Sequence, residues 1–176
     1  ITARMEAGCR DLNPPAPNQS TEFDVAQHHA IRQNYSAMVE NIDRWLGLYQ
    51  ERLAARGELE NTLIVYSSDH GEMLGDHNQW GKTQPYEASV GVPLVVAGPG
   101  VVPGKASEAL VSLIDLPATF LECAGRPGGT YGDGKTLWPV LRGERHTQRE
   151  HMLSGLGDWR AVRDARTRAA PSRAPI

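Results

Sequence analysis

The sequence predicts an α/β fold that forms part of a layered αβα domain. Three observations lead to this class: a long segment with helical periodicity, two short continuous apolar runs, and the order helix, strand, loop, strand, helix. The chain has 176 residues, of which 40% are hydrophobic and 22% are charged. These values are typical of a globular chain that can bury a core.

The first predicted element is a long helix from about residue 23 to residue 56. Large apolar or aromatic side chains recur at alternating spacings of four and three, which marks one face of a helix. These side chains are Ile31, Tyr35, Met38, Ile42, Trp45, Tyr49 and Leu53. At the start, Thr21 and Asp24 fit a variant capping box in which Asp takes the Glu position. At the end, Gly57 fits the C-terminal stop.

Two predicted strands follow the helix. The run "NTLIVYSS" (61–68) is continuously apolar at its centre and does not alternate, which is typical of a strand covered on both faces. The segment "VPLVVAGPG" (92–100) predicts a second strand of this kind, which Pro99 and Gly100 terminate.

Two shorter elements are predicted near the end of the chain. The segment 108–125 predicts a short strand or turn and then a helix, with Pro117 near its first turn and Gly125 at its end. The segment "TLWPVLRGE" (136–144) predicts a short helical turn. No internal repeat is present.

Composition excludes several classes of function. The net charge of -3, without a concentrated basic face, gives no case for nucleic acid. The apolar runs are far too short to span a membrane, and no signal peptide pattern occurs. The two cysteines, Cys9 and Cys123, form neither a disulfide framework nor a metal motif. We interpret both as unpaired, with Cys123 on the apolar face of its helix, and the compartment stays open.

The candidate site begins with Asp69 and His70, directly after the first predicted strand. Ligands of open α/β sheets gather beyond the carboxyl ends of strands, and Gly71 lets the chain turn sharply there. A carboxylate and an imidazole on adjacent residues can reach one divalent cation. The oxygen favours Ca²⁺ or Mg²⁺, and the imidazole favours Mn²⁺, Zn²⁺ or Fe. The alternative is that Asp69 caps the next turn and His70 is a surface residue.

Four more residues of this loop are candidates. Lys82, delivered by a glycine-containing loop, could act as a point charge on a sulfate or phosphate oxygen, or it is a solvated surface lysine. Asp76 and His77 could hydrogen-bond to a ligand residue and orient it, or they could only shape the loop, and we favour the role in loop structure. Glu72 could orient a ligand. By contrast, His28 and His29 lack the spacing of a helical zinc motif and are interpreted as surface histidines.

Four blocks of the chain resemble a known family. "TLIVYSSDHGEMLGDHNQWGK", "PYEASVGVPLVVAGPG", "SLIDLPATFLECAG" and "DGKTLWPVLRGE" resemble, in this order, the second half of sulfatases of the alkaline phosphatase superfamily. The resemblance covers roughly residues 30 to 163. The Asp-His-Gly form is similar to the branch with choline sulfatases and phosphonate monoester hydrolases. The implied fold is part of an alkaline-phosphatase-like αβα sandwich with an incomplete central sheet.

The resemblance also implies roles for the site residues. Asp69 and His70 would coordinate a divalent metal, which is Ca²⁺ by family, with Mn²⁺ as an alternative because of the His ligand. Lys82 would be catalytic and contact the sulfate or the oxygen of the nucleophile, and His77 would be a further substrate-binding residue. The nucleophile of the family is a formylglycine made within a Cys/Ser-x-Pro-x-Arg motif. A metal and cationic side chains stabilise the charge on the transferred group.

The sequence departs from the family pattern at the nucleophile. Cys9 is followed by "RDLNPP" and Cys123 by "AGRP", so neither fits the formylglycine motif. The strand with paired aspartates that completes the metal site is also missing. We therefore expect a fragment, inactive by itself. Its predicted parts are a loop or linker (1–20), the C-terminal part of a sulfatase-type catalytic domain (21–150), and a strand remnant with a disordered Ala/Arg/Pro-rich tail (151–176).

Three functions remain open at this point. The first is a sulfuric ester hydrolase that acts on a small-molecule sulfate ester. The second is a phosphonate or phosphate ester hydrolase of the same superfamily, because the two anions have similar tetrahedral shapes. The third is a non-catalytic metal- or anion-binding remnant. Neither nucleic acid nor membrane is an expected partner, and the oligomeric state stays open.

Overall fold

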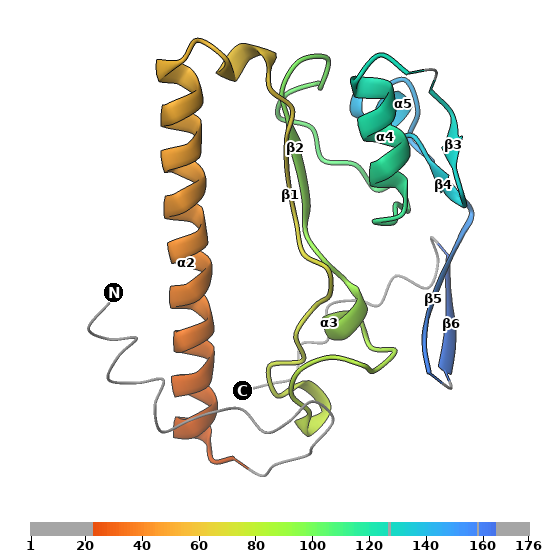
Figure 1. Ribbon diagram of the computed structural model, residues 1–176. Coiled ribbons are helices and arrows are strands. Elements are labelled where there is room, and N and C mark those ends of the chain that lie inside the picture. The colour runs from red at the N-terminus through yellow and green to blue at the C-terminus, as the bar shows by residue number, and fades with distance from the viewer. Residues whose placement is uncertain (1–22, 127, 158, 165–176) are drawn as a thin grey trace. The chain divides into compact units, whose positions relative to one another are not determined.

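A computed structural model describes residues 23–126, 128–157 and 159–164 (Figure 1). The described residues divide into two compact units. The first unit contains residues 23–61 and 70–92, and the second contains residues 62–69 and 93–164. The chain therefore passes from the second unit to the first between Asp69 and His70, which are the two predicted metal ligands.

The first unit contains the long helix α2 (Val25–Ala55), which confirms the predicted helix. Its cap differs from the predicted one. Asp24 is the N-cap: its Oδ1 accepts from the Gln27 backbone N–H at 2.8 Å, and Gln27 Oε1 accepts from the Asp24 N–H at 2.9 Å. The predicted Thr21–Asp24 box was wrong. The chain offers two overlapping boxes, and the one that begins at Asp24 satisfies two helix-end donors reciprocally.

The predicted stop of this helix at Gly57 is confirmed. Gly57 has a left-handed φ of 70°. Its N–H donates to the Ala54 carbonyl at 2.9 Å, and the Glu58 N–H donates to the Leu53 carbonyl at 2.9 Å. This pair of bonds is the Schellman arrangement that ends a helix at a glycine. The short 3-10 helix η1 (Leu59–Asn61) follows.

Burial of the predicted apolar face is limited to its first member. Ile31 is the buried residue of α2, with 7% of its surface exposed. Five members of the predicted face are exposed side chains: Tyr35, Met38, Ile42, Trp45 and Tyr49. Arg32, near the start of α2, donates side-chain hydrogen bonds to the Leu74 carbonyl in the loop of the same unit.

The second unit begins with β1 (Ile64–Ser67), which pairs antiparallel with β2 (Leu94–Ala97). Both predicted strands are thus confirmed. In register, Ile64 lies opposite Ala97 and Ser67 opposite Leu94. Every residue of β1 is half-buried, whereas β2 alternates and leaves Val95 60% exposed. The prediction that both strands are covered on both faces was therefore wrong for β2, because Val95 and Ala97, which share one face of the strand, are both exposed.

Helix α4 (Asp115–Cys123) packs against β3 (Thr130–Tyr131) and β4 (Gly134–Lys135) in the second unit (Figure 1). The predicted helix and its end at Gly125 are confirmed, and the segment before it forms a turn. Cys123 has a free thiol, as predicted, but it is exposed. Its placement on the apolar face was wrong, because the buried residues of α4 are Asp115, Ala118 and Thr119.

Polar groups organise the core of this unit. The fully buried Asp115 carboxylate accepts from the backbone N–H groups of Ser112 and Lys135 and pairs with Arg149. Thr119 Oγ1 donates to the Asp115 carbonyl at 2.7 Å and accepts from the Leu137 N–H at 2.9 Å. These bonds join α4 to the segment that leads into the predicted helical turn, which is α5 (Trp138–Leu141).

The last described strands are β5 (His151–Leu156) and β6 (Trp159–Asp164), which form an antiparallel hairpin (Figure 1). A strand in this region was predicted. Residues 165–176 of the predicted tail lie outside the described residues, and so does the predicted linker at 1–20.

In the part of the chain that the structure describes, no helix is long and apolar enough to cross a lipid bilayer.

Candidate metal and anion site

The two candidate metal ligands follow strand β1. Asp69 is exposed and His70 is half-buried. His70 Nδ1 lies 2.7 Å from the Gly71 carbonyl oxygen. Because a carbonyl only accepts, Nδ1 carries the proton, and in the neutral ring the lone pair is then on Nε2. A neutral imidazole with one nitrogen committed to a carbonyl is the form in which histidine binds metals.

Gly71 is required by a close approach of the backbone. Its N–H donates to the Ser89 carbonyl at 2.8 Å, which joins the loop to the short helix α3 (Glu87–Val90). A Cβ at position 71 would collide with the carbonyl oxygens of Ala88 and Gly91. The predicted need for a glycine at this turn is therefore confirmed, and its cause is the space occupied by the α3 backbone.

The loop from residue 72 to residue 81 is closed by hydrogen bonds between its two ends. The Glu72 Oε1 atom accepts from the Gly81 N–H at 2.6 Å and from the Leu74 N–H at 3.2 Å. The Met73 N–H donates to the Gly81 carbonyl at 2.8 Å. Glu72, which the sequence left open as a residue that could orient a ligand, thus bonds to the backbone of its own loop.

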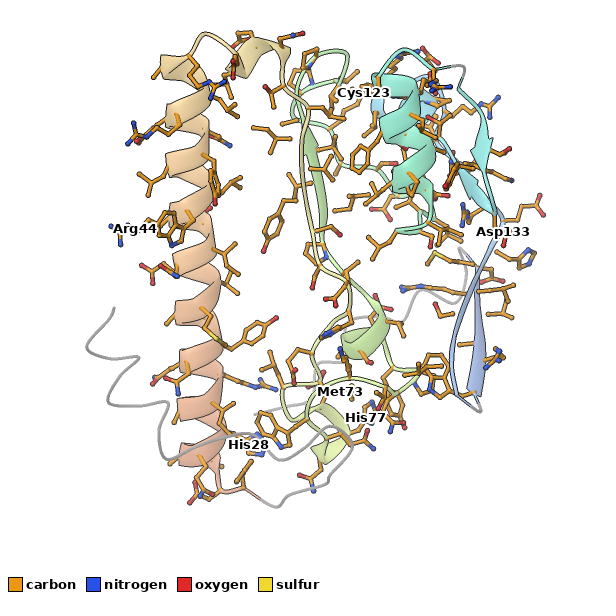
Figure 2. All side chains as sticks on the ribbon, in the orientation of Figure 1. His28, Arg44, Met73, His77, Cys123 and Asp133 are labelled. Carbon is orange, nitrogen blue, oxygen red and sulfur yellow. The ribbon has the colours of Figure 1, made fainter. Side chains whose placement is uncertain are left out.

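A buried aromatic cluster supports this loop. Met73 and Trp80 are 0% and 1% exposed. The Trp80 ring meets the Phe23 ring edge-on, with centroids 5.4 Å apart, and lies 5.2 Å from the His28 ring. Figure 2 shows His28 near the first turns of α2, with Met73 on the loop of the same unit. The interpretation of His28 as a surface residue was wrong, because its ring packs on Trp80, whereas His29 is exposed.

Arg32 of α2 ties the same loop to the helix. Its Nε and Nη2 atoms donate to the Leu74 carbonyl at 3.1 and 3.0 Å, and Nη2 lies 3.4 Å from Asp76 Oδ1. Asp76 therefore contributes to the loop conformation, which is the role we favoured for it. No sequence signal pointed to Arg32, because it lies 42 residues from Leu74 in the chain.

His77 lies in the 3-10 turn η2 (Asp76–Asn78) and has a left-handed φ of 54°. Its exposed ring stacks on the ring of Tyr86, with centroids 4.0 Å apart and planes 17° apart. This contact of His77 is thus with another loop residue, and Tyr86 was missed by the sequence analysis. A role of His77 in substrate binding stays a prediction.

Lys82 follows directly after the closed loop. It is half-buried, and with the described residues its side chain forms no hydrogen bond or ion pair. Its neighbours Gly81 and Thr83 both have positive φ, of 75° and 89°. A positive φ is rare for a β-branched residue such as Thr83 and persists only where the surroundings enforce it. Lys82 therefore stands between two residues with positive φ.

The metal-ligating set in the described chain is small. No group of three or more His, Cys, Asp or Glu side chains that could hold a metal occurs within residues 23–126, 128–157 and 159–164. Asp69 and His70 are consecutive, so they are two donors of suitable chemistry that lie close together through the chain itself. Calcium, with six to eight oxygen ligands, and zinc, with four, both need more donors than these two.

The fold and the loop together define an α/β protein with a candidate metal and anion site after a strand end. A family model described as Sulfatase matches residues 8–126, and the chain belongs to the sulfatase family. Members of this family are hydrolases that act on sulfate esters. The predicted family and the predicted alkaline-phosphatase-like α/β fold are confirmed.

Two curated relatives illustrate the similarity. Human (Homo sapiens) N-acetylglucosamine-6-sulfatase is 36% identical over 159 residues, which are 88% of this chain and 28% of the relative. Human arylsulfatase K is 37% identical over 139 residues, which are 79% of this chain and 26% of the relative. The chain therefore spans about a quarter of the length of these relatives.

Solved structures show the same fold. A phosphonate monoester hydrolase from Silicibacter pomeroyi has a TM-score of 0.70 and 35% identity, and the match covers 76% of this chain and 27% of that one. A protein solved with its substrate D-glucosamine-2-N,6-O-disulfate has a TM-score of 0.72 and 29% identity, with 79% and 31% covered. The predicted resemblance to phosphonate monoester hydrolases is thus confirmed by a solved structure of one such enzyme.

Proposed function

We propose that this chain supplies the metal-binding pair Asp69–His70 and the anion-binding Lys82 of a sulfuric ester hydrolase. The observation that supports this most directly is the state of Lys82. A half-buried lysine without an ion-pair partner among the described residues can act as a point charge on an approaching anion. The closed loop before Lys82 holds its backbone in place for such an anion.

The residues divide the chemistry between them. Asp69 would offer a carboxylate oxygen and His70 its Nε2 lone pair to a divalent cation, with Ca²⁺ favoured and Mn²⁺ as the alternative. When bound, that cation supplies Lewis acidity at the ester oxygens. Lys82 would stabilise the negative charge that develops on the transferred group. A nucleophile of the Cys/Ser-x-Pro-x-Arg type does not occur in these 176 residues.

A second candidate function keeps the site and changes the anion. The 35% identity and the TM-score of 0.70 to a phosphonate monoester hydrolase favour a phosphonate monoester as substrate. A lysine acts as a point charge and does not distinguish tetrahedral sulfate from phosphonate. Small-molecule sulfate esters remain the first choice, because the family model and both curated relatives are sulfatases.

The test is made on the intact natural protein that carries this chain. Hydrolysis of an aryl sulfate and of a phenylphosphonate monoester is compared for the wild type and Lys82→Ala. We expect the aryl sulfate to be preferred, and Lys82→Ala to lower kcat/KM for it by about a hundredfold, as for other groups that stabilise developing charge. Lys105→Ala, which removes the same charge at an exposed position, is the matched control.

Metal content is measured separately from activity. Asp69→Ala and His70→Ala should each lose bound calcium or manganese, as quantified by elemental analysis after dialysis. Retention of the full metal content by both variants would remove the metal part of the proposal. Wild-type activity in Lys82→Ala would remove the anion part.

A further inference from the structure

We propose that Glu72 is a positioning residue for Lys82. Its carboxylate holds the residue that precedes the lysine, and so it sets the direction in which the lysine side chain leaves the loop. This inference rests on the proposed function, in which Lys82 binds the transferred anion.

The hydrogen bonds of Gly81 carry the argument. Its N–H donates to Glu72 Oε1 at 2.6 Å, and its carbonyl accepts from the Met73 N–H at 2.8 Å. Both backbone polar groups of the residue before Lys82 are therefore bonded to the 72–73 segment. A bond to an ionised carboxylate is about twice as strong as one between neutral groups. Glu72 is half-buried, which weakens competition from water.

The conformation on either side of Lys82 explains why such a hold is needed. Gly81 and Thr83 have φ values of 75° and 89°, and positive φ at Thr83 is unfavourable for a β-branched residue. A loop released from Glu72 would relax toward ordinary φ values and redirect the lysine. Trp80, which is buried on Phe23 and His28, anchors the other side of Gly81.

The same bonds argue against a direct chemical role for the bonded oxygen. Glu72 Oε1 accepts from two backbone N–H groups, those of Gly81 and Leu74. A carboxylate oxygen that binds the loop in this way acts through the lysine and does not need to touch the substrate. Glu72 lies two residues after His70, so a role as a metal ligand is the rival that the experiment must separate.

The test uses Glu72→Ala, Glu72→Gln and Lys82→Ala in the intact natural protein, with Glu60→Ala as a control for loss of an exposed carboxylate. Loss of a bond to a charged group predicts a fall in kcat/KM for the aryl sulfate of about tenfold or more in Glu72→Ala. Glu72→Gln should recover most of this loss, because its amide oxygen can still accept the Gly81 N–H.

A double-mutant cycle shows whether Glu72 acts through Lys82. If it does, adding Glu72→Ala to Lys82→Ala should lower kcat/KM by less than about twofold, since the positioned group is already absent. Full additivity of the two losses would overturn the proposal. Loss of bound metal in Glu72→Ala would also overturn it, in favour of a metal ligand.

Two readouts do not depend on turnover. Hydrogen exchange of the Gly81 amide should accelerate in Glu72→Ala and stay near wild type in Glu72→Gln. Binding of inorganic sulfate should weaken in Glu72→Ala and in Lys82→Ala. If the wild type neither binds sulfate nor hydrolyses the ester, the proposed function fails. If the wild type does both while Glu72→Ala equals it, the positioning role alone fails.

Discussion

The guanidinium of Arg32 donates two hydrogen bonds to one carbonyl, that of Leu74, from Nε at 3.1 Å and from Nη2 at 3.0 Å. This fork joins the first turns of α2 to the loop that precedes Lys82. Because both donors converge on a single acceptor, the planar guanidinium group suits the contact better than a lysine would.

Replacement of Arg32 should loosen the loop and leave the helix intact. We expect Arg32→Ala to lower the local stability of residues 72–81 by about 1 kcal/mol, a modest value because the side chain is 44% exposed. Hydrogen exchange of the loop amides measures this change. Arg44→Ala, at an exposed position farther along α2 (Figure 2), is the control and should leave loop exchange unchanged. Equal exchange in both variants would contradict the role given to Arg32.

Two glycine-to-alanine substitutions should have opposite effects. Gly71→Ala places a methyl group against the backbone of Ala88 and Gly91 and should destabilise the protein by about 1–3 kcal/mol. Gly47→Ala lies inside α2 with open space around the new Cβ and should stabilise the helix by up to about 1 kcal/mol. Urea unfolding curves of the intact protein give both values. A stable Gly71→Ala would show that the α3 backbone can move aside.

The hydroxyl of Thr119 should matter more than its size. Thr119→Val keeps the side-chain shape but removes the acceptor of the Leu137 N–H, which is then buried without a partner. We expect a loss of about 1–3 kcal/mol in the free energy of unfolding. Thr130→Val, at an exposed position of β3, makes the same chemical change and should have little effect. Similar losses of unfolding free energy in the two variants would contradict the role given to the Thr119 hydroxyl.

The 176-residue chain by itself should show no turnover. It contains no Cys/Ser-x-Pro-x-Arg motif, so it lacks the nucleophile expected for a sulfatase. The assay is hydrolysis of an aryl sulfate by the purified chain with calcium or manganese present. Measurable hydrolysis that disappears in Lys82→Ala would show that the nucleophile lies within these residues.

Much of the local structure follows from local signals. Apolar periodicity predicts the helix at 25–55. A glycine next to the last turn predicts the end of this helix at Gly57 and the end of α4 at Gly125. The N-cap does not follow from local signals alone, because capping patterns that begin at Thr21 and at Asp24 overlap in the sequence. Local sequence favours both, and the Asp24–Gln27 bonds select one.

The candidate site also contains residues that the sequence identifies and contacts that it does not. Asp69, His70 and Lys82 could be found from the sequence, because their chemistry and their place after an apolar run are local properties. The contacts that hold the loop in place could not be found from the sequence. Glu72 meets Gly81 across the loop, and Arg32 meets Leu74 over 42 residues of chain.

By itself, then, the sequence determined the α/β class, the sulfatase resemblance and the residue types that could bind a metal and an anion. The tertiary structure decided which groups hold the loop: the Glu72 carboxylate, the Arg32 guanidinium and the buried Trp80 ring. The physical reason is that periodicity and turn chemistry report neighbours along the chain. Hydrogen bonds and packing between distant segments depend on how the chain folds back on itself.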